Sequence, residues 1–213
     1  MGVSENRVIL AYLHQPRQLP ARLHAALRDR LPYGRRMRLR GDLAAQALTL
    51  VGIELARRLL GQAVGREVAA AALRFPYGGK PHAPGLPDFS ISHSGRWVGC
   101  AVATAGRVGL DLECAGPECA GTMPARDLGD WTAREAVLKA AGASLDAAAR
   151  VALDAAGADF GGRRWQLLRP TAPPGCIAAL ALEQPAELLL VPPVTIAENS
   201  ALDERTSAGR YAP

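Results

Sequence analysis

The order of segments along this sequence predicts an α+β fold. Helical patterns dominate the first third of the chain, and strand patterns then follow one another from Phe89 to Glu113. One more helix and two more strands are expected after residue 130. Consecutive strands without helices between them argue against the alternating βαβ order of parallel sheets. At 213 residues the chain can form one large domain or two small ones around a hydrophobic core.

The first half is predicted to begin with a strand and continue with helices. The apolar run from Arg7 to Leu13 is typical of a strand, and Pro20 to Arg30 is predicted as a helix. A long helix is expected from the N-cap residue Asp42 to about Leu60, with Gly61 as its stop. A shorter alanine-rich helix is expected over Arg66 to Leu73. The apolar residues of the long helix recur at helical spacing: Leu43, Ala47, Leu50, Val51 and Leu55.

The second half is predicted to be mostly strands. Alternating or short apolar runs between turn residues predict them, and Ser92 to Gly95 is expected to form a polar turn after the first. A helix is expected over Trp131 to Ala141, and the chain from about Pro192 is predicted to be extended or disordered. The predicted strands are Phe89–Ile91, Trp97–Ala103, Val108–Glu113, Arg164–Arg169 and Cys176–Leu182.

Composition narrows the class of protein. Apolar runs are interrupted well before 18 residues, which argues against a membrane span, and the first residues lack a secretory pattern. The net charge of +5 favours anionic partners, but few aromatic residues lie among the arginines, so a nucleic-acid platform is poorly supported. Without a Cys-x-x-Cys pair, the cysteines are expected to be buried or free thiols in a reducing cytoplasm. They are Cys100, Cys114, Cys119 and Cys176.

Val108 to Glu113 is the most informative segment. Its apolar residues alternate with Gly109, Asp111 and Glu113, so a strand places both carboxylates on one face, about 6–7 Å apart at Cα. Two acids held in this way repel each other unless a cation lies between them, and Mg²⁺ suits such oxygen ligands. The alternative is an edge strand whose acidic face is simply solvated.

Two other segments carry candidate chemistry, each with an ordinary alternative. Glu135 and Lys139 share a helix face and could serve a metal, a proton or a phosphate, or form only an ion pair beside a Thr132–Glu135 capping box. The turn Ser92 to Gly95 offers hydroxyls and an imidazole that could bind phosphate oxygens. This interpretation is favoured over a serine hydrolase site, because adjacent residues in one turn rarely form the required arrangement. Lys80 is either a phosphate ligand or a solvated loop lysine.

Together and in order, these motifs resemble the Sfp-type 4′-phosphopantetheinyl transferases. The resemblance covers roughly residues 32–182. It implies a pseudo-dimer of two related α+β halves with the active site between them, predicted here as residues 1–106 and 107–191, followed by a flexible tail at 192–213. The motifs are Gly79-Lys80-Pro81, Phe89 to Gly95, Val108 to Glu113, and Trp131 to Lys139.

The resemblance implies a reaction and a set of roles. The enzyme would move the phosphopantetheine arm of coenzyme A to a serine of an acyl or peptidyl carrier protein, releasing adenosine 3′,5′-bisphosphate. The resemblance implies that Asp111, Glu113 and Glu135 are Mg²⁺ ligands, that Glu135 is also the proton acceptor, and that Lys139 contacts the α-phosphate. A monomer without nucleic-acid or membrane partners is expected. The residues expected to hold coenzyme A are Lys80, Pro81, Ser92, His93, Lys139, Arg35 and Arg36.

The sequence departs from the family pattern at three places. Arg134 stands where the family usually has lysine, and Leu48 stands where it commonly has a phosphate-binding arginine, so Arg35, Arg36 or Arg38 is expected to replace that charge. Only 17 residues lie between Glu113 and Trp131, fewer than in family members that use this segment to dock the carrier. These departures leave open a second hypothesis, a module that binds coenzyme A or a carrier protein without catalysis.

Overall fold

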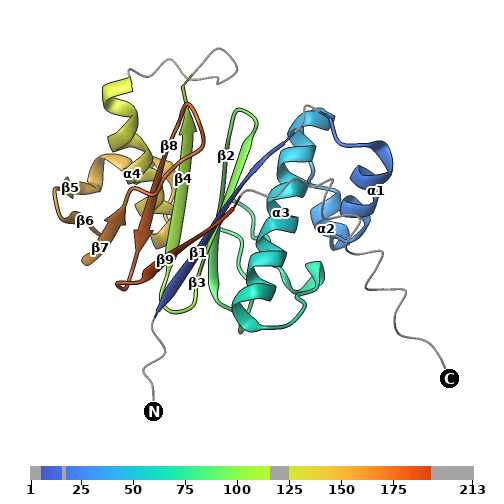
Figure 1. The fold of residues 1–213 in the computed structure, drawn as a ribbon, viewed down its shortest axis with the longest axis horizontal. Helices are drawn as coiled ribbons and strands as arrows, with labels where there is room; N and C mark the ends of the chain where they lie inside the picture. Colours follow the sequence, from blue (N-terminus) through green and yellow to red (C-terminus); the bar gives the residue numbers. More distant parts are fainter. Residues whose placement is uncertain (1–5, 16–17, 116–124, 193–213) are drawn as a thin grey trace.

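A computed structural model describes residues 6–15, 18–115 and 125–192 and confirms the α+β class. Four α-helices, two 3-10 helices and nine strands follow one another along the described part of the chain, and Figure 1 shows their arrangement. The helical segments are α1 (Ala21–Asp29), α2 (Tyr33–Arg36), α3 (Leu43–Val64), α4 (Ala125–Ala141) and the 3-10 helices Ala70–Ala72 and Leu145–Arg150. The strands are β1 (Arg7–His14), β2 (Asp88–Ser94), β3 (Trp97–Ala103), β4 (Val108–Cys114), β5 (Ala152–Asp154), β6 (Gly157–Phe160), β7 (Arg163–Leu168), β8 (Cys176–Leu182) and β9 (Glu187–Val191).

The strands form two sheets, each covered by one long helix. The first has the order β2-β3-β1-β9 and packs against α3, while the second has the order β4-β8-β7-β6-β5 and packs against α4. Neighbouring strands are antiparallel except for β1 and β9, which run parallel. The predicted boundary at residue 106 lies between β3 and β4, yet β9 returns to the first sheet; the division into halves stays a prediction.

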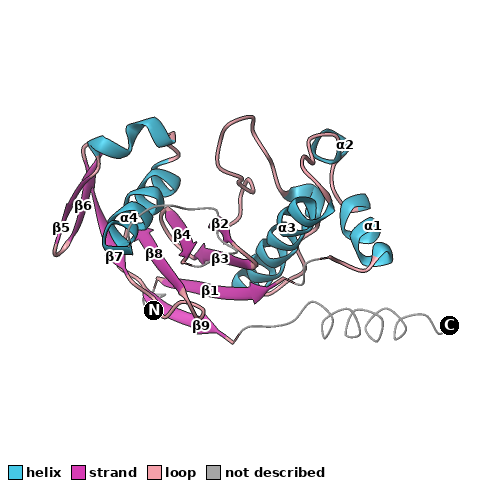
Figure 2. Ribbon diagram, turned by 90° about the horizontal axis from the view of Figure 1, so that it is seen from above, coloured by secondary structure: helices cyan, strands magenta, loops and turns pink. Residues whose placement is uncertain are grey.

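The edges of the two sheets meet where β2 lies beside β4. Both strands are edge strands of their own sheets, and Figure 2 shows them between α3 and α4. Side chains of β2 make the connection: the backbone N–H groups of Val108, Leu112 and Cys114 donate to Asp88, Ser92 and Ser94. The partners in each pair are 20 residues apart, so the two strands run in the same direction. Polar side chains thus satisfy the outer edge of β4.

Several element boundaries differ from the sequence prediction. Helix α3 continues past Gly61 to Val64 and ends at Gly65, whose positive φ of 69° makes it the C-cap. The helix predicted over 66–73 is only a 3-10 turn at Ala70–Ala72. Strand β2 extends through Ser94, so the predicted polar turn at Ser92 and His93 is wrong. Strands β5, β6 and β9 were not predicted, because they are short and lack a strong alternating pattern.

Two further predictions, a capping box and free thiols, are wrong. Helix α4 begins at Ala125, so Thr132 lies inside the helix and donates to the carbonyl of Leu128 instead of forming a capping box. Cys114 and Cys176 form a disulfide rather than remaining thiols, because the register of β4 and β8 places them directly opposite each other. Cys100 is a buried free thiol, as expected. The predicted tail and most of the short connection after Cys114 lie outside the described residues.

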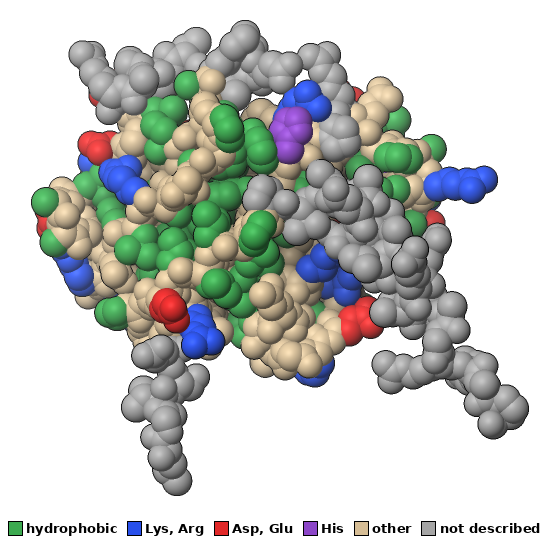
Figure 3. Space-filling view, in the orientation of Figure 1, with side chains coloured by type: hydrophobic (Ala, Val, Ile, Leu, Met, Phe, Trp, Pro, Cys, Tyr) green, Lys and Arg blue, Asp and Glu red, His purple; other side chains and the backbone are tan. Residues whose placement is uncertain are grey.

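The described surface includes an apolar area over the strands. Hydrophobic side chains gather in the middle of the face seen in Figure 3, where β8 and β9 lie in Figure 1. Strand β9 contributes Leu189 and Leu190, which are both exposed. Among the described residues, no helix combines the length and the apolar character needed to cross a bilayer.

Candidate functional site

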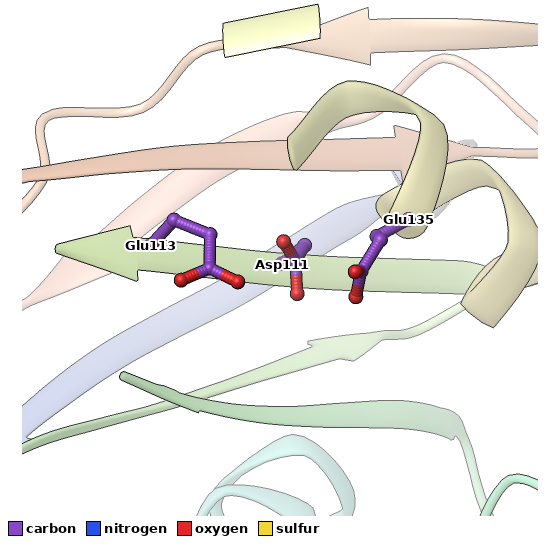
Figure 4. A group of neighbouring side chains, drawn as sticks. All are labelled: Asp111, Glu113 and Glu135. Carbon is purple, nitrogen blue, oxygen red and sulfur yellow. The ribbon is translucent and has the colours of Figure 1, made fainter. Parts of the chain in front are cut away.

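Three carboxylates from two elements converge beside the junction of the sheets. Asp111 and Glu113 come from β4, and Glu135 comes from α4. One carboxylate oxygen from each residue lies within 4.8 Å of the other two. Figure 4 shows Asp111 between Glu113 and Glu135, with the three carboxylates turned to the same side. The arrangement offers only oxygen ligands, which are the ligands that Mg²⁺ prefers in proteins.

A glycine on β4 allows the helix to come this close. A Cβ atom at Gly109 would lie 1.9 Å from the carbonyl oxygen of Ala136 and 2.5 Å from the backbone nitrogen of Ala140. The backbone of α4 therefore crosses β4 directly over Gly109. This crossing brings Glu135 and Lys139 beside Asp111, two residues farther along the strand.

Lys139 is the counter-ion of Asp111. Its ammonium lies 2.5 Å from Oδ1 of Asp111 and 3.9 Å from the Glu135 carboxylate. It also donates to the Ser92 hydroxyl at 3.1 Å. The helical ion pair predicted between Glu135 and Lys139 is present, but the closer partner of the lysine is the acid on β4. One ammonium thus faces three carboxylates, so the cluster retains excess negative charge.

Burial and this excess charge raise the pKa values of two of the acids. Burial, and then the negative charge of Asp111, raise the pKa of Glu135 to about 7, although Lys139 lowers it. Burial also raises the pKa of Glu113, with a further contribution from Asp111, against the opposing effect of the Ser94 hydroxyl. Carboxylates that resist ionisation without a cation are expected where a cation belongs.

Within the described ranges, one carboxylate oxygen of Asp111 has no hydrogen-bond partner. The residue is only 1% exposed. Its Oδ1 atom accepts from Lys139 and Ser92, whereas Oδ2 is buried and has no partner among the described residues. An unsatisfied buried carboxylate oxygen is costly, and a metal ion at this position would remove that cost. The donor set and this oxygen both fit Mg²⁺.

The two serines of β2 hold the acids of β4. Ser92 donates to Oδ1 of Asp111 at 3.0 Å, and Ser94 donates to Oε2 of Glu113 at 2.9 Å. The resemblance predicts Ser92 as a cofactor ligand and gives no individual role to Ser94. The two serines are two residues apart, a spacing typical of one face of a strand, and this spacing is the sequence signal that could have identified Ser94.

Among the other predicted cofactor ligands, His93 lies on the first sheet, and Lys80 and Pro81 lie on the loop before it. The charges of Lys139 and Asp111 both act on His93 of β2. The pKa of His93 is lowered, first because neighbouring atoms displace water from the ring and then because Lys139 is positive. Lys80 is ion-paired with Asp88 and donates to the carbonyl of Val108 at 2.7 Å. It thereby connects the loop containing Pro81 to the beginnings of β2 and β4.

The arginines of the α2 region differ in what they contact. Arg36 is 3.9 Å from the carboxylate of Asp29. Arg38 donates to the carbonyls of Gly34 and Phe75. Arg35 lies over the Phe75 ring at 5.0 Å, and its buried Nε atom has no hydrogen-bond partner among the described residues. Burial, and then the positive charge of Arg38, lower the pKa of Arg35.

Comparison with known proteins supports a partial relationship. A 4′-phosphopantetheinyl transferase from Bacillus subtilis is 43% identical to this chain over 67 residues. The chain spans about 30% of the length of this curated relative, and the match covers 30% of the chain itself. No protein-family model matches the chain. The match supports a family relationship at most, and it suggests a transferase.

Proposed function

We propose that this protein is a Mg²⁺-dependent 4′-phosphopantetheinyl transferase that acts on an acyl or peptidyl carrier protein. The observation that carries the proposal is the buried Oδ2 atom of Asp111, which lies among three convergent carboxylates and has no hydrogen-bond partner in the described part of the chain. The partial match to a 4′-phosphopantetheinyl transferase supports the class of reaction. The proposal includes a pseudo-dimeric fold, which the presence of two sheets, each covered by one helix, supports.

Asp111, Glu113 and Glu135 would hold the metal in this proposal. When bound, Mg²⁺ would neutralise negative charge on the diphosphate of coenzyme A. Lys139 would turn from Asp111 towards the α-phosphate and stabilise the charge that develops on the leaving group. The ion pairs of Lys139 with Asp111 and Glu135 place its ammonium beside the proposed metal ligands, which supports this role.

Proton transfer would fall to Glu135, directly or through a water molecule. The hydroxyl oxygen of the carrier serine would form a bond to the β-phosphorus while the bond from that phosphorus to the bridging oxygen breaks. Glu135 would take the hydroxyl proton, and adenosine 3′,5′-bisphosphate would leave. The Glu135 carboxylate faces the same side as those of Asp111 and Glu113, which supports its assignment as the proton acceptor.

The remaining contacts with coenzyme A are proposed on both sides of the β2–β4 junction. His93 is close enough to Lys139 and Asp111 to be affected by their charges, which supports a role at a phosphate group. Of the arginines expected to replace a cation at Leu48, Arg35 has the best support. Its Nε atom lacks a partner in the described part of the chain, whereas Arg36 faces Asp29. Lys80 would have to leave Asp88 to contact the cofactor.

Mass spectrometry of carrier proteins tests the proposal. The purified chain is incubated with coenzyme A, Mg²⁺ and a panel of apo-carrier proteins, each with its serine-to-alanine variant as control. We expect a mass gain of one phosphopantetheine group on a carrier that retains its serine, and loss of the gain in EDTA. Transfer that persists without divalent metal would overturn the role of the acidic cluster.

The second candidate is a binding module that holds coenzyme A or a carrier protein without turnover. Leu48 and the short connection after Glu113 favour it, as does the pairing of Lys80 with Asp88. Isothermal calorimetry separates the two functions. Tight, Mg²⁺-dependent binding of coenzyme A with no transfer to any carrier supports the module, and transfer excludes it.

A further inference from the structure

Two serines of β2 repeat the same contact with β4. Ser92 donates to Asp111 Oδ1 and accepts from the backbone N–H of Leu112, the residue that follows the acid. Ser94 donates to Glu113 Oε2 and accepts from the N–H of Cys114, which again follows the acid. Each serine thus contacts one carboxylate and the next backbone N–H, and the second contact is displaced by two residues on both strands.

We propose that Ser92 and Ser94 are positioning residues that orient Asp111 and Glu113 for a divalent cation. The proposal rests on the metal site of the proposed function. Each hydroxyl occupies a single oxygen of its carboxylate. At Asp111 this leaves Oδ2 buried and without a partner among the described residues. The serines therefore determine which oxygen of each acid is available to the metal.

The contacts restrain the acids more strongly than an isolated hydrogen bond would. Each serine is itself attached to the backbone of β4, so its hydroxyl oxygen has a fixed position relative to the strand. Ser92 and Ser94 are nearly buried, at 5% and 9% exposure, so water competes little for these bonds. Groups that orient metal ligands in this way commonly determine a large part of the affinity.

This arrangement also assigns Ser92 a role different from a phosphate ligand. Its hydroxyl has one proton, which it gives to Asp111, and it accepts from both Leu112 and Lys139. A hydroxyl offers one donor and two acceptor positions, so all three are used. Ser92 could bind a phosphate oxygen through its side chain only by releasing Asp111.

A Thr/Val pair at each position provides the test. Ser94→Thr keeps the hydroxyl, whereas Ser94→Val has nearly the same shape without it, and the same pair is made at Ser92. The affinity of each purified protein for Mn²⁺ is measured by electron paramagnetic resonance without coenzyme A or carrier protein. We expect the valine variants to bind Mn²⁺ about 10- to 100-fold more weakly than the matching threonine variants.

Ser90→Ala is the matched control, because Ser90 is on the same strand, is 2% exposed and shows no hydrogen bond to these acids among the described contacts. Its Mn²⁺ affinity should equal that of the unsubstituted protein. Equal affinity in the folded Thr and Val variants would overturn the positioning role while leaving the proposed function intact. Failure of the unsubstituted protein to bind Mn²⁺ would instead overturn the metal site itself. Circular dichroism confirms that each variant is folded.

Discussion

At the scale of single residues, the site depends on an imbalance of charge. Asp111, Glu113 and Glu135 share one nearby ammonium, that of Lys139. Burial, and then this imbalance, raise the pKa of Glu135 well above that of an ordinary glutamate. Without a metal, ionising this group opposes folding, and a divalent cation reverses the effect. The acids thus reduce the stability of the metal-free protein while making it selective for a cation.

This imbalance predicts a particular pH dependence of stability. Because the pKa of Glu135 is about 7 in the folded protein and near 4.5 in the unfolded chain, the folded state holds the proton longer. In EDTA, the free energy of unfolding should therefore fall as pH rises from about 4.5 to 7, by at most about 3 kcal/mol. Urea titrations measure it.

Glu135→Gln should remove most of this fall, because glutamine does not ionise. Glu187→Gln is the control, since Glu187 lies on β9 with its side chain 62% exposed. Adding Mg²⁺ should restore stability to the unsubstituted protein near pH 7.5 and have little effect on Glu135→Gln. If the free energy of unfolding fell equally with pH in Glu135→Gln and in the unsubstituted protein, the assignment of the raised pKa to Glu135 would be contradicted.

At the scale of elements, the crossing of α4 over β4 decides whether the site exists. The strand provides two acids and the helix provides Glu135 and Lys139, and they meet only because Gly109 has no side chain. The contact involves backbone atoms of Ala136 and Ala140, which no rotamer change can move aside. A side chain at this position must displace the helix.

Gly109→Ala should therefore destabilise the protein by about 3 kcal/mol and weaken Mn²⁺ binding. Gly129→Ala is the control within the same helix, because its Cβ would meet only the end of the Arg169 side chain, at 3.4 Å. That change should be neutral or should stabilise the helix by about 0.5–1 kcal/mol. Thermal unfolding and metal titration measure both effects. Unchanged metal affinity in Gly109→Ala would show that the close crossing is dispensable.

At the scale of the whole molecule, two sheets meet edge to edge, and a disulfide between Cys114 and Cys176 lies near the junction. The disulfide joins the end of β4 to the beginning of β8, and the backbone N–H of Cys114 also donates to the Ser94 hydroxyl. It closes a loop of 62 residues that includes α4 and the strands β5 to β7. The whole second sheet is therefore constrained by this bond.

Reduction should lower the stability of the chain. Loop-closure entropy predicts a loss of up to about 4 kcal/mol, which corresponds to a decrease in Tm of up to about 8–16 °C. Differential scanning calorimetry with and without dithiothreitol measures the change. The double variant Cys114→Ser/Cys176→Ser should melt near the reduced protein and should not respond to dithiothreitol. An equal Tm for the oxidised and reduced proteins would contradict a stabilising role for the bond.

Local patterns predicted much of the fold, because they depend on neighbouring residues. The strands Trp97–Ala103 and Cys176–Leu182 have the predicted limits, since short apolar runs between turn residues define them. The period of two in Val108 to Glu113 placed Asp111 and Glu113 on one face, which the structure confirms. Patterns at separations of two to four residues are visible without any knowledge of the tertiary fold.

Tertiary structure decided the relations between distant segments. The sequence predicts a turn at Ser94, because its contacts with β4, some 20 residues later, are not visible in the local pattern. The sequence predicts thiols at Cys114 and Cys176, because the strand register that places them opposite each other is not visible in the local pattern. The short β9 could not be predicted because its strand conformation depends on parallel pairing with β1, about 180 residues earlier.

The sequence by itself therefore determined which residues could form the site: two carboxylates on one strand face and a glutamate and lysine on one helix face. Only the tertiary structure decided how they meet, through the crossing of α4 over Gly109 and the contacts of Ser92 and Ser94. The physical reason is that side-chain direction follows from local backbone geometry, whereas the distance between two elements depends on packing between segments far apart in the chain.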